Sequence, residues 1–205
     1  FTQTGSNKLN KLGTIILLLF LTVFSSMSVV AEAPDLIQVS LEKLNQVITQ
    51  RRDDYAQNPQ RTYAEVAAVL TSTFDFDAFS LGVMGKKNAA ANPQLPQVFA
   101  QILKQSLVKI FTDGLMSLGP YTVELDSPAQ SKPNRAKVHM KVATESGATH
   151  ELTYSLALDE QWWIRNVTFD GVNLGLTLRG QFANLVTTRG SVEQAVTDWK
   201  IDDGQ

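Results

Sequence analysis

The sequence of 205 residues contains no cysteine and only two histidines. Without cysteine, no disulfide supports the fold, and no lipid-modified cysteine attaches the chain to a membrane. His139 and His150 have no partner acids at the spacing of metal ligands, so we expect no metal site. Stability must therefore come from an apolar core, which hydrophobic residues amounting to 43% of the chain can supply.

The sequence also lacks the motifs of common catalytic and nucleotide-binding sites. Neither a G-x-S-x-G motif nor a phosphate-binding P-loop occurs. Asp75 and Asp77 flank Phe76, and an apolar environment can raise the pKa of a carboxyl group enough for it to act as a base. Aspartate at the start of a short helix more often caps that helix. We therefore expect no catalytic residue and no cofactor.

The sequence also lacks a large excess of charge of either sign. The chain has 18 Lys and Arg against 20 Asp and Glu, a formal net charge of −2, and no pronounced basic cluster. This mildly acidic balance argues against nucleic-acid binding and against strong adhesion to anionic lipid surfaces. No internal repeat and no low-complexity tract interrupts the sequence.

The N-terminal segment has the features of a secretory signal peptide. Two lysines are the only charges before Glu32, and an apolar block follows them at residues 15–24. Small and polar residues then lead to Ala31, after which we predict cleavage. The alternative is a retained membrane anchor at residues 12–31, because this charge-free run approaches the roughly 20 residues of a spanning helix.

Removal of a signal peptide comprising residues 1–31 would leave residues 32–205 as a single domain. The chain begins with Phe rather than Met, so we expect its natural start to lie upstream. The remainder divides into a helical first half and a stranded second half.

Apolar spacing predicts the elements of both halves. The expected helices lie at about residues 35–54, 63–70, 76–85, 95–118, 175–189 and 191–199, and residues 86–96 are expected to be a polar loop. The expected strands lie at residues 121–125, 135–143, 150–158 and 162–169, with a turn at Asp170-Gly171. Alternation is clearest from Arg135 to Ala143, where every second residue is apolar. The pattern predicts an α+β fold, with N-terminal and C-terminal helices packed on a curved antiparallel sheet that encloses an apolar cavity.

One segment resembles a known protein family. It reads Trp162-Trp-Ile-Arg-Asn-Val in the last strand, Asp170-Gly-Val-Asn-Leu at the turn and Arg179-Gly-Gln-Phe in the next helix. The MlaC-like, toluene-tolerance family carries W-x-I-x-D-V, D-G-V-S-L and Y-R-x-Q-F. Upstream, Phe74-Asp-Phe and Gly85 resemble the family's F-D-F and the glycine that ends its next helix. The order and spacing of elements agree from about residue 35 to 199.

The resemblance implies a periplasmic phospholipid-binding protein, an auxiliary component of an ABC transporter system. Such a protein carries glycerophospholipid between an inner-membrane ABC transporter complex and an outer-membrane lipoprotein complex, and so maintains outer-membrane lipid asymmetry. A carrier of this kind needs a deep apolar cavity. Burial of one methylene contributes about 0.8 kcal/mol of free energy. Two acyl chains of roughly 15 methylenes each therefore require a cavity whose burial of them contributes on the order of 24 kcal/mol.

The long helix and the strand face around Tyr154 are the candidate linings of such a cavity. The residues expected to line it are Phe99, Ile102, Leu103, Leu107, Ile110, Tyr154, Phe169, Val172, Leu178 and Phe182. Arg179 is the candidate for the head-group phosphate, and its alternative is an ion pair with an acid such as Asp170. Without the resemblance, a filled core is the favoured interpretation of these apolar residues, because a broad apolar stripe usually packs in a core.

Two other functions remain open at this point. One is a small-molecule enzyme of cone-shaped α+β fold, with Asp75 or Asp77 as the base in the same pocket. The other is a periplasmic interaction module with a filled core and no ligand. Phospholipid that co-purifies with the protein would separate the carrier from both.

Overall fold

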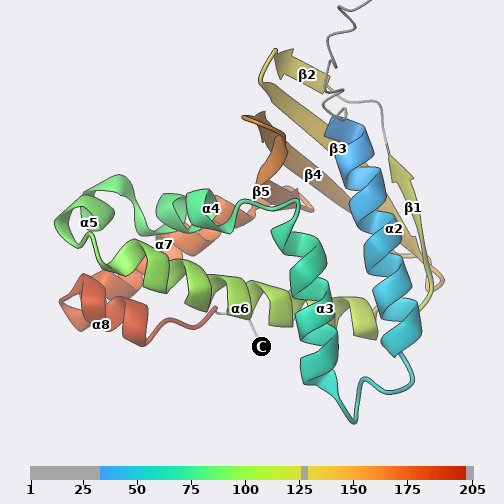
Figure 1. Cartoon of the computed structure of the whole chain (residues 1–205), viewed down its shortest axis with the longest axis horizontal. Coiled ribbons are helices and arrows are strands. Elements are labelled where there is room, and N and C mark those ends of the chain that lie inside the picture. The colour runs from blue at the N-terminus through green and yellow to red at the C-terminus, as the bar shows by residue number, and fades with distance from the viewer. Residues whose placement is uncertain (1–32, 126–128, 202–205) are drawn as a thin grey trace, which may run out of the picture. The chain divides into compact units, whose positions relative to one another are not determined.

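The computed structural model describes residues 33–125 and 129–201. The predicted signal peptide and the alternative anchor at residues 12–31 lie outside these ranges. Within them, no helix is long and apolar enough to cross a membrane. The predicted α+β class is confirmed, since helices pack against an antiparallel sheet (Figure 1).

Helices form the first half of the described chain, as the sequence predicts. They are α2 (Ala33–Arg51), α3 (Pro59–Thr71), α4 (Phe76–Met84), α5 (Lys86–Ala91) and α6 (Leu95–Ser117). The longest of them, α6, matches its predicted bounds to within one residue. Two more follow the sheet, α7 (Leu174–Arg189) and α8 (Val192–Thr197).

The prediction of a polar loop at residues 86–96 is wrong. Residues 86–91 form α5, and α6 already begins at Leu95. Three consecutive alanines favour the helix, and Ala89 is buried in the core. Gly85 separates α4 from α5, since its φ of +83° lies where only glycine fits without strain.

All pairings between the named strands of the sheet are antiparallel. Its strands are β1 (Tyr121–Leu125), β2 (Ala129–Lys132), β3 (Arg135–Thr144), β4 (Thr149–Leu158), β5 (Trp162–Phe169) and β6 (Val172–Asn173). The order is β1-β3-β4-β5-β6, and β2 pairs with β3 beyond the end of β1. The predicted turn is confirmed, because Asp170 and Gly171 both have positive φ, as a type I′ turn requires. The sequence did not indicate β2 and β6, which are too short to show an apolar alternation.

Strand β3 shows how one face of the sheet is built. Ala136, Val138, Met140 and Val142 are all buried, whereas Arg135, Lys137 and Lys141, which alternate with them, are exposed. Helix α2 packs on β3 from the apolar side, and α4 and α7 contact β5. The sheet therefore has one face toward the helices and one toward water.

Away from the sheet, the helices enclose an aromatic cluster. Phe99 of α6 and Phe182 of α7 are fully buried, with ring centroids 4.7 Å apart. Trp199, which follows α8, stands 5.3 Å from Phe99 and 5.7 Å from Phe182. This cluster is densely packed and holds α6, α7 and α8 together.

A polar network fixes the α2–α3 hairpin on α6. The hydroxyl groups of Tyr55 and Tyr63 both donate to Oδ1 of Asp113, the latter at 2.7 Å, and Lys109 Nζ lies 2.5 Å from Oδ2. Burial alone would raise the pKa of the Asp113 carboxyl, but hydrogen bonds from Lys109, Tyr55 and Tyr63 outweigh it and hold that pKa below its ordinary value. Arg51 of α2 adds two hydrogen bonds to Glu65 of α3, at 2.7 and 2.8 Å.

The lowered pKa predicts how the stability of the hairpin depends on pH. A carboxylate with a depressed folded-state pKa stabilises the fold above its unfolded pKa, about 3.9, and loses that contribution as pH falls through the folded value. We expect Asp113→Asn to lower the free energy of unfolding at pH 7, and the difference from the parent to shrink below about pH 4. Urea unfolding between pH 7 and pH 3 measures it. Asp53→Asn, an exposed change in the same hairpin, is the control and should show little difference at any pH. If the free energy of unfolding of Asp113→Asn stays as far below that of the parent at pH 3 as at pH 7, the lowered pKa of Asp113 is contradicted.

Candidate functional site

The inner face of the sheet is incompletely covered at its centre. The main helix contacts of the sheet are those of α2 with β3 and of α4 and α7 with β5. Among the described elements, no helix packs extensively on β4, the strand between them. Leu152 and Tyr154 of β4 and Val167 of β5 are accordingly only half-buried, although they belong to the apolar face.

Cross-strand pairing joins these residues into rows. One row runs Leu125, Met140, Leu152 and Phe169 across β1, β3, β4 and β5, and another runs Val138, Tyr154 and Val167. Three steps between neighbouring strands span roughly 14 Å. The apolar face is therefore continuous from the β1 edge to the β5 side of the sheet.

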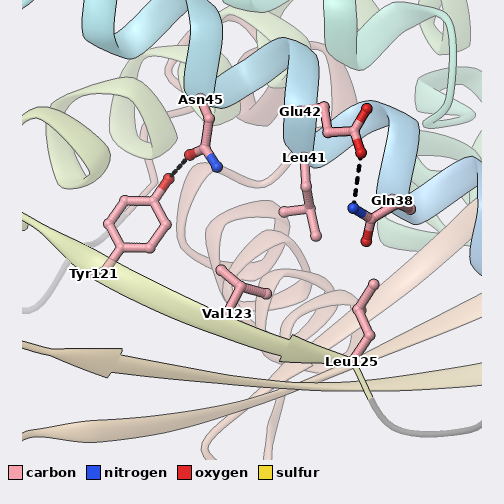
Figure 2. A pocket seen from close by; sticks show the side chains of 7 residues that line it. All are labelled: Gln38, Leu41, Glu42, Asn45, Tyr121, Val123 and Leu125. Carbon is pink, nitrogen blue, oxygen red and sulfur yellow. Dashed lines mark hydrogen bonds between the residues drawn. The ribbon is translucent and has the colours of Figure 1, made fainter.

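A pocket of about 270 Å³ lies between α2 and β1, over one end of this face. It is lined by Gln38, Leu41, Glu42 and Asn45 of α2 and by Tyr121, Val123 and Leu125 of β1 (Figure 2). In Figure 2, Leu41 points from the helix toward Val123 and Leu125 on the strand. The polar residues flank this apolar centre. Gln38 donates to Glu42 at 2.8 Å, and the Tyr121 hydroxyl donates to the side-chain oxygen of Asn45.

Two tyrosines on the same face are partly shielded from water. Burial raises the pKa of Tyr121, and burial together with the nearby Tyr121 raises the pKa of Tyr154. The Tyr154 hydroxyl makes no hydrogen bond to any residue in the described ranges. A phenol held in an apolar environment without a partner is available to a bound polar group.

The structure distributes the predicted cavity residues over three places. Phe99, Leu103, Leu178 and Phe182 are almost completely buried in the helical core, within or beside the aromatic cluster. Ile102 and Leu107 pack partly buried against that core, and Ile110 is 38% exposed. Tyr154 lies on the open sheet face, and Phe169 and Val172, 47% and 57% exposed, lie where β5 turns into β6. Ligand contact at these residues stays a prediction.

The residues that line the α2–β1 pocket are not among the predicted site residues. Gln38, Leu41, Glu42 and Asn45 recur at helical spacing, and Tyr121, Val123 and Leu125 alternate along a strand. Each pattern indicates a shared face. Neither pattern indicates that the two faces meet, since 75 or more residues separate them in the sequence.

The alternative that Arg179 pairs with Asp170 is wrong. Asp170 Oδ2 lies 2.8 Å from Nδ1 of His150, and Oδ1 accepts from the backbone N–H of Glu151 at 2.8 Å. The hydrogen bond from His150, followed by that from Glu151, lowers the pKa of Asp170. Arg179 is exposed beside Gly85, where its Nη2 lies 3.9 Å from the position that a Cβ would take. It is not among the residues that line the pocket.

Asp75 performs the capping role that the sequence favoured. Its Oδ1 accepts from the backbone N–H of Ala78 at 2.8 Å, and its Oδ2 accepts from Arg165. Both oxygens are therefore engaged in holding the structure, whereas Asp77 in the first turn of α4 is exposed. In the part of the chain that the structure describes, no three His, Cys, Asp or Glu side chains gather as a metal site would require.

Comparison with known proteins agrees with this geometry. A curated relative, toluene tolerance protein ttg2D of Pseudomonas putida, is 28% identical over 187 residues, which cover 89% of this chain and 87% of the relative. A solved structure of a phospholipid-binding protein from Ralstonia solanacearum, in complex with a phospholipid, shares the fold with a TM-score of 0.73 at 21% identity. The match covers 82% of this chain and 94% of that one. The model of the MlaC protein family matches residues 38–200. The chain therefore belongs to the MlaC family.

Proposed function

We propose that this protein binds a phospholipid whose acyl chains lie between the apolar sheet face and the helices. The observation that carries the proposal is the apolar sheet face, which is only half-buried at Leu152 and Tyr154 of β4 and reaches the α2–β1 pocket at Leu125. Large apolar side chains left partly open at the centre of a sheet are suited to an apolar ligand. Membership of the MlaC family and the phospholipid complex of the Ralstonia solanacearum protein support the same ligand class.

In this proposal α2 moves away from β1 when the ligand enters, because the pocket is small. At about 270 Å³, the pocket lies at the small end of the roughly 300–1,000 Å³ that drug-sized ligands occupy. The hydrogen bond from Tyr121 to Asn45 joins the two sides of the pocket. A neutral hydrogen bond contributes about 0.5–1.5 kcal/mol, and one buried methylene about 0.8 kcal/mol. Burial of a few methylenes therefore offsets the loss of this contact.

The lining favours recognition of the chains over recognition of the phosphate. Glu42 is the only charged residue among the seven that line the pocket, and no cation is present there. A phosphate held inside would meet a carboxylate without a counter-charge, which is unfavourable in a poorly solvated site. In this proposal the head group stays at the mouth, beside the polar side chains of α2.

We further propose that the protein is exported to the periplasm and shuttles phospholipid between an inner-membrane ABC transporter complex and an outer-membrane complex. A lipid that crosses an aqueous compartment needs its chains covered for the whole journey. A reversible apolar cavity provides that cover. In this way the protein would contribute to outer-membrane lipid asymmetry.

The first test is direct detection of the ligand. Native mass spectrometry of protein purified without detergent should show an added mass equal to one phospholipid, and organic extraction should release that lipid. Protein without bound lipid that also takes none up from phospholipid vesicles would overturn the proposal.

A second test fills the pocket. Val123→Trp adds bulk into the space between β1 and α2, so we expect less co-purified phospholipid and a melting temperature close to that of the delipidated parent. Thr122→Trp makes a similarly large change on the exposed face of the same strand and should leave the lipid load unchanged.

Leu103→Trp is the packed-core comparison. Leu103 is 1% exposed, so the larger ring has no room there and should cost about 1–3 kcal/mol of stability. If Val123→Trp destabilises the protein as much as Leu103→Trp while its lipid load stays at the parental level, the pocket is not where the chains bind.

A further inference from the structure

A second pocket, of about 410 Å³, lies at the end of the sheet where β2 is labelled in Figure 1. It is lined by residues of the β2–β3 hairpin and of β4, namely Lys132, Asn134, Arg135, Ala136, Lys137, Ser155 and Leu156. Three of these seven residues carry a positive charge and none carries a negative one. This balance is unusual in a chain whose formal net charge is −2.

The backbone brings the three cations together. Lys132 and Arg135 are paired across the β2–β3 hairpin, and Arg135 and Lys137 are two positions apart on β3, roughly 6.6 Å. Because side chains alternate along a strand, Arg135 and Lys137 project from the face opposite to the buried Ala136 and Val138. The three charged residues are exposed and stand on the outer side of the sheet, away from the proposed acyl-chain site.

These cations have no acidic partners among the described residues. Arg135 donates a hydrogen bond to the backbone oxygen of Asn134 at 3.4 Å, and neither lysine forms an ion pair with a described residue. The adjoining β4–β5 turn carries Asp159 and Glu160, and Asp159 is already paired with Arg165. Farther along β3, the cation Lys141 stands between Glu124 of β1 and Glu151 of β4. Among the residues that the structure describes, positive charge without an ion-pair partner therefore collects at the Lys132 end of the strand.

We propose that Lys132, Arg135 and Lys137 form a binding site for a phosphate group. The guanidinium of Arg135 is suited to two parallel hydrogen bonds with phosphate oxygens, and the lysines supply mobile point charges on either side. The Ser155 hydroxyl and the Asn134 amide line the same pocket and offer neutral donors. The phosphate is either that of an anionic lipid head group at a bilayer surface or a soluble phosphate ion.

Two probes distinguish these sources. Inorganic phosphate is titrated into ¹⁵N-labelled, lipid-loaded protein at low, constant ionic strength, and amide shifts at residues 132–137 are followed. Co-sedimentation is measured with vesicles of equal parts phosphatidylglycerol and phosphatidylcholine, and with vesicles of phosphatidylcholine alone. Binding to the mixed vesicles without a response to inorganic phosphate assigns the site to lipid head groups. A response to inorganic phosphate without vesicle binding assigns it to the soluble ion.

The variants test the named residues. Each of Lys132→Ala, Arg135→Ala and Lys137→Ala should weaken binding about fivefold, and the triple variant on the order of a hundredfold. Lys141→Ala is the matched control, because it removes the same charge from the same face of β3 where two glutamates flank it, and it should change binding less than twofold. If the parent binds neither probe, or if the triple variant binds as the parent does, the proposal is overturned.

The same variants test whether this phosphate site and the acyl-chain site are independent. The triple variant should retain its co-purified phospholipid, and Val123→Trp should retain phosphate or vesicle binding. Loss of both properties in either variant at an unchanged melting temperature would show that the two sites are one, which contradicts the placement on opposite faces.

Discussion

Backbone hydrogen bonds between residues 73–75 and Ile164 join the helices to the sheet. The N–H of Ile164 donates to Thr73 at 2.8 Å, and the N–H of Asp75 donates to Ile164 at 3.0 Å, so the chain between α3 and α4 runs as a short parallel addition to β5. Asp75 at this junction also caps α4 and pairs with Arg165. The end of α3, the start of α4 and one side of the sheet are thereby fixed together, while β4 is left without a closely packed helix.

This arrangement separates the tasks of stability and ligand binding. The cluster of Phe99, Phe182 and Trp199 is filled, and dense packing of this kind supplies much of the stability of a chain without disulfides. The sheet side is filled less completely, with half-buried Leu152 and Tyr154 and a pocket under α2. A protein that binds and releases an apolar ligand needs both regions, because a core that was filled everywhere would leave no room for the ligand.

The two faces of the sheet also differ in chemistry. Its inner face is apolar and, as we propose, covers acyl chains. The outer face carries Arg135, Lys137 and Lys141, which alternate along β3 with the buried apolar residues of the inner face. Neighbouring glutamates offset the charge at Lys141 but not at the β2 end. The total composition, with slightly more acidic than basic residues, conceals this local excess. Net charge therefore describes long-range attraction poorly when the fold gathers like charges at one place.

The sequence by itself determined the order and type of the principal elements. The alternation from Arg135 to Ala143 sufficed for β3 and its buried face, and the wide stripe from Leu95 sufficed for α6, because local periodicity depends only on the geometry of the element itself. The tertiary structure alone decided two other features. Strands β2 and β6 form only because they pair with neighbouring strands, and the fold determines which surface packs against each apolar face. Phe99 and Phe182 became packed core, while Leu41 and Val123 became the lining of a pocket. Periodicity gives the direction in which a side chain points, but distant segments of the chain determine whether another side chain or an open space lies opposite it.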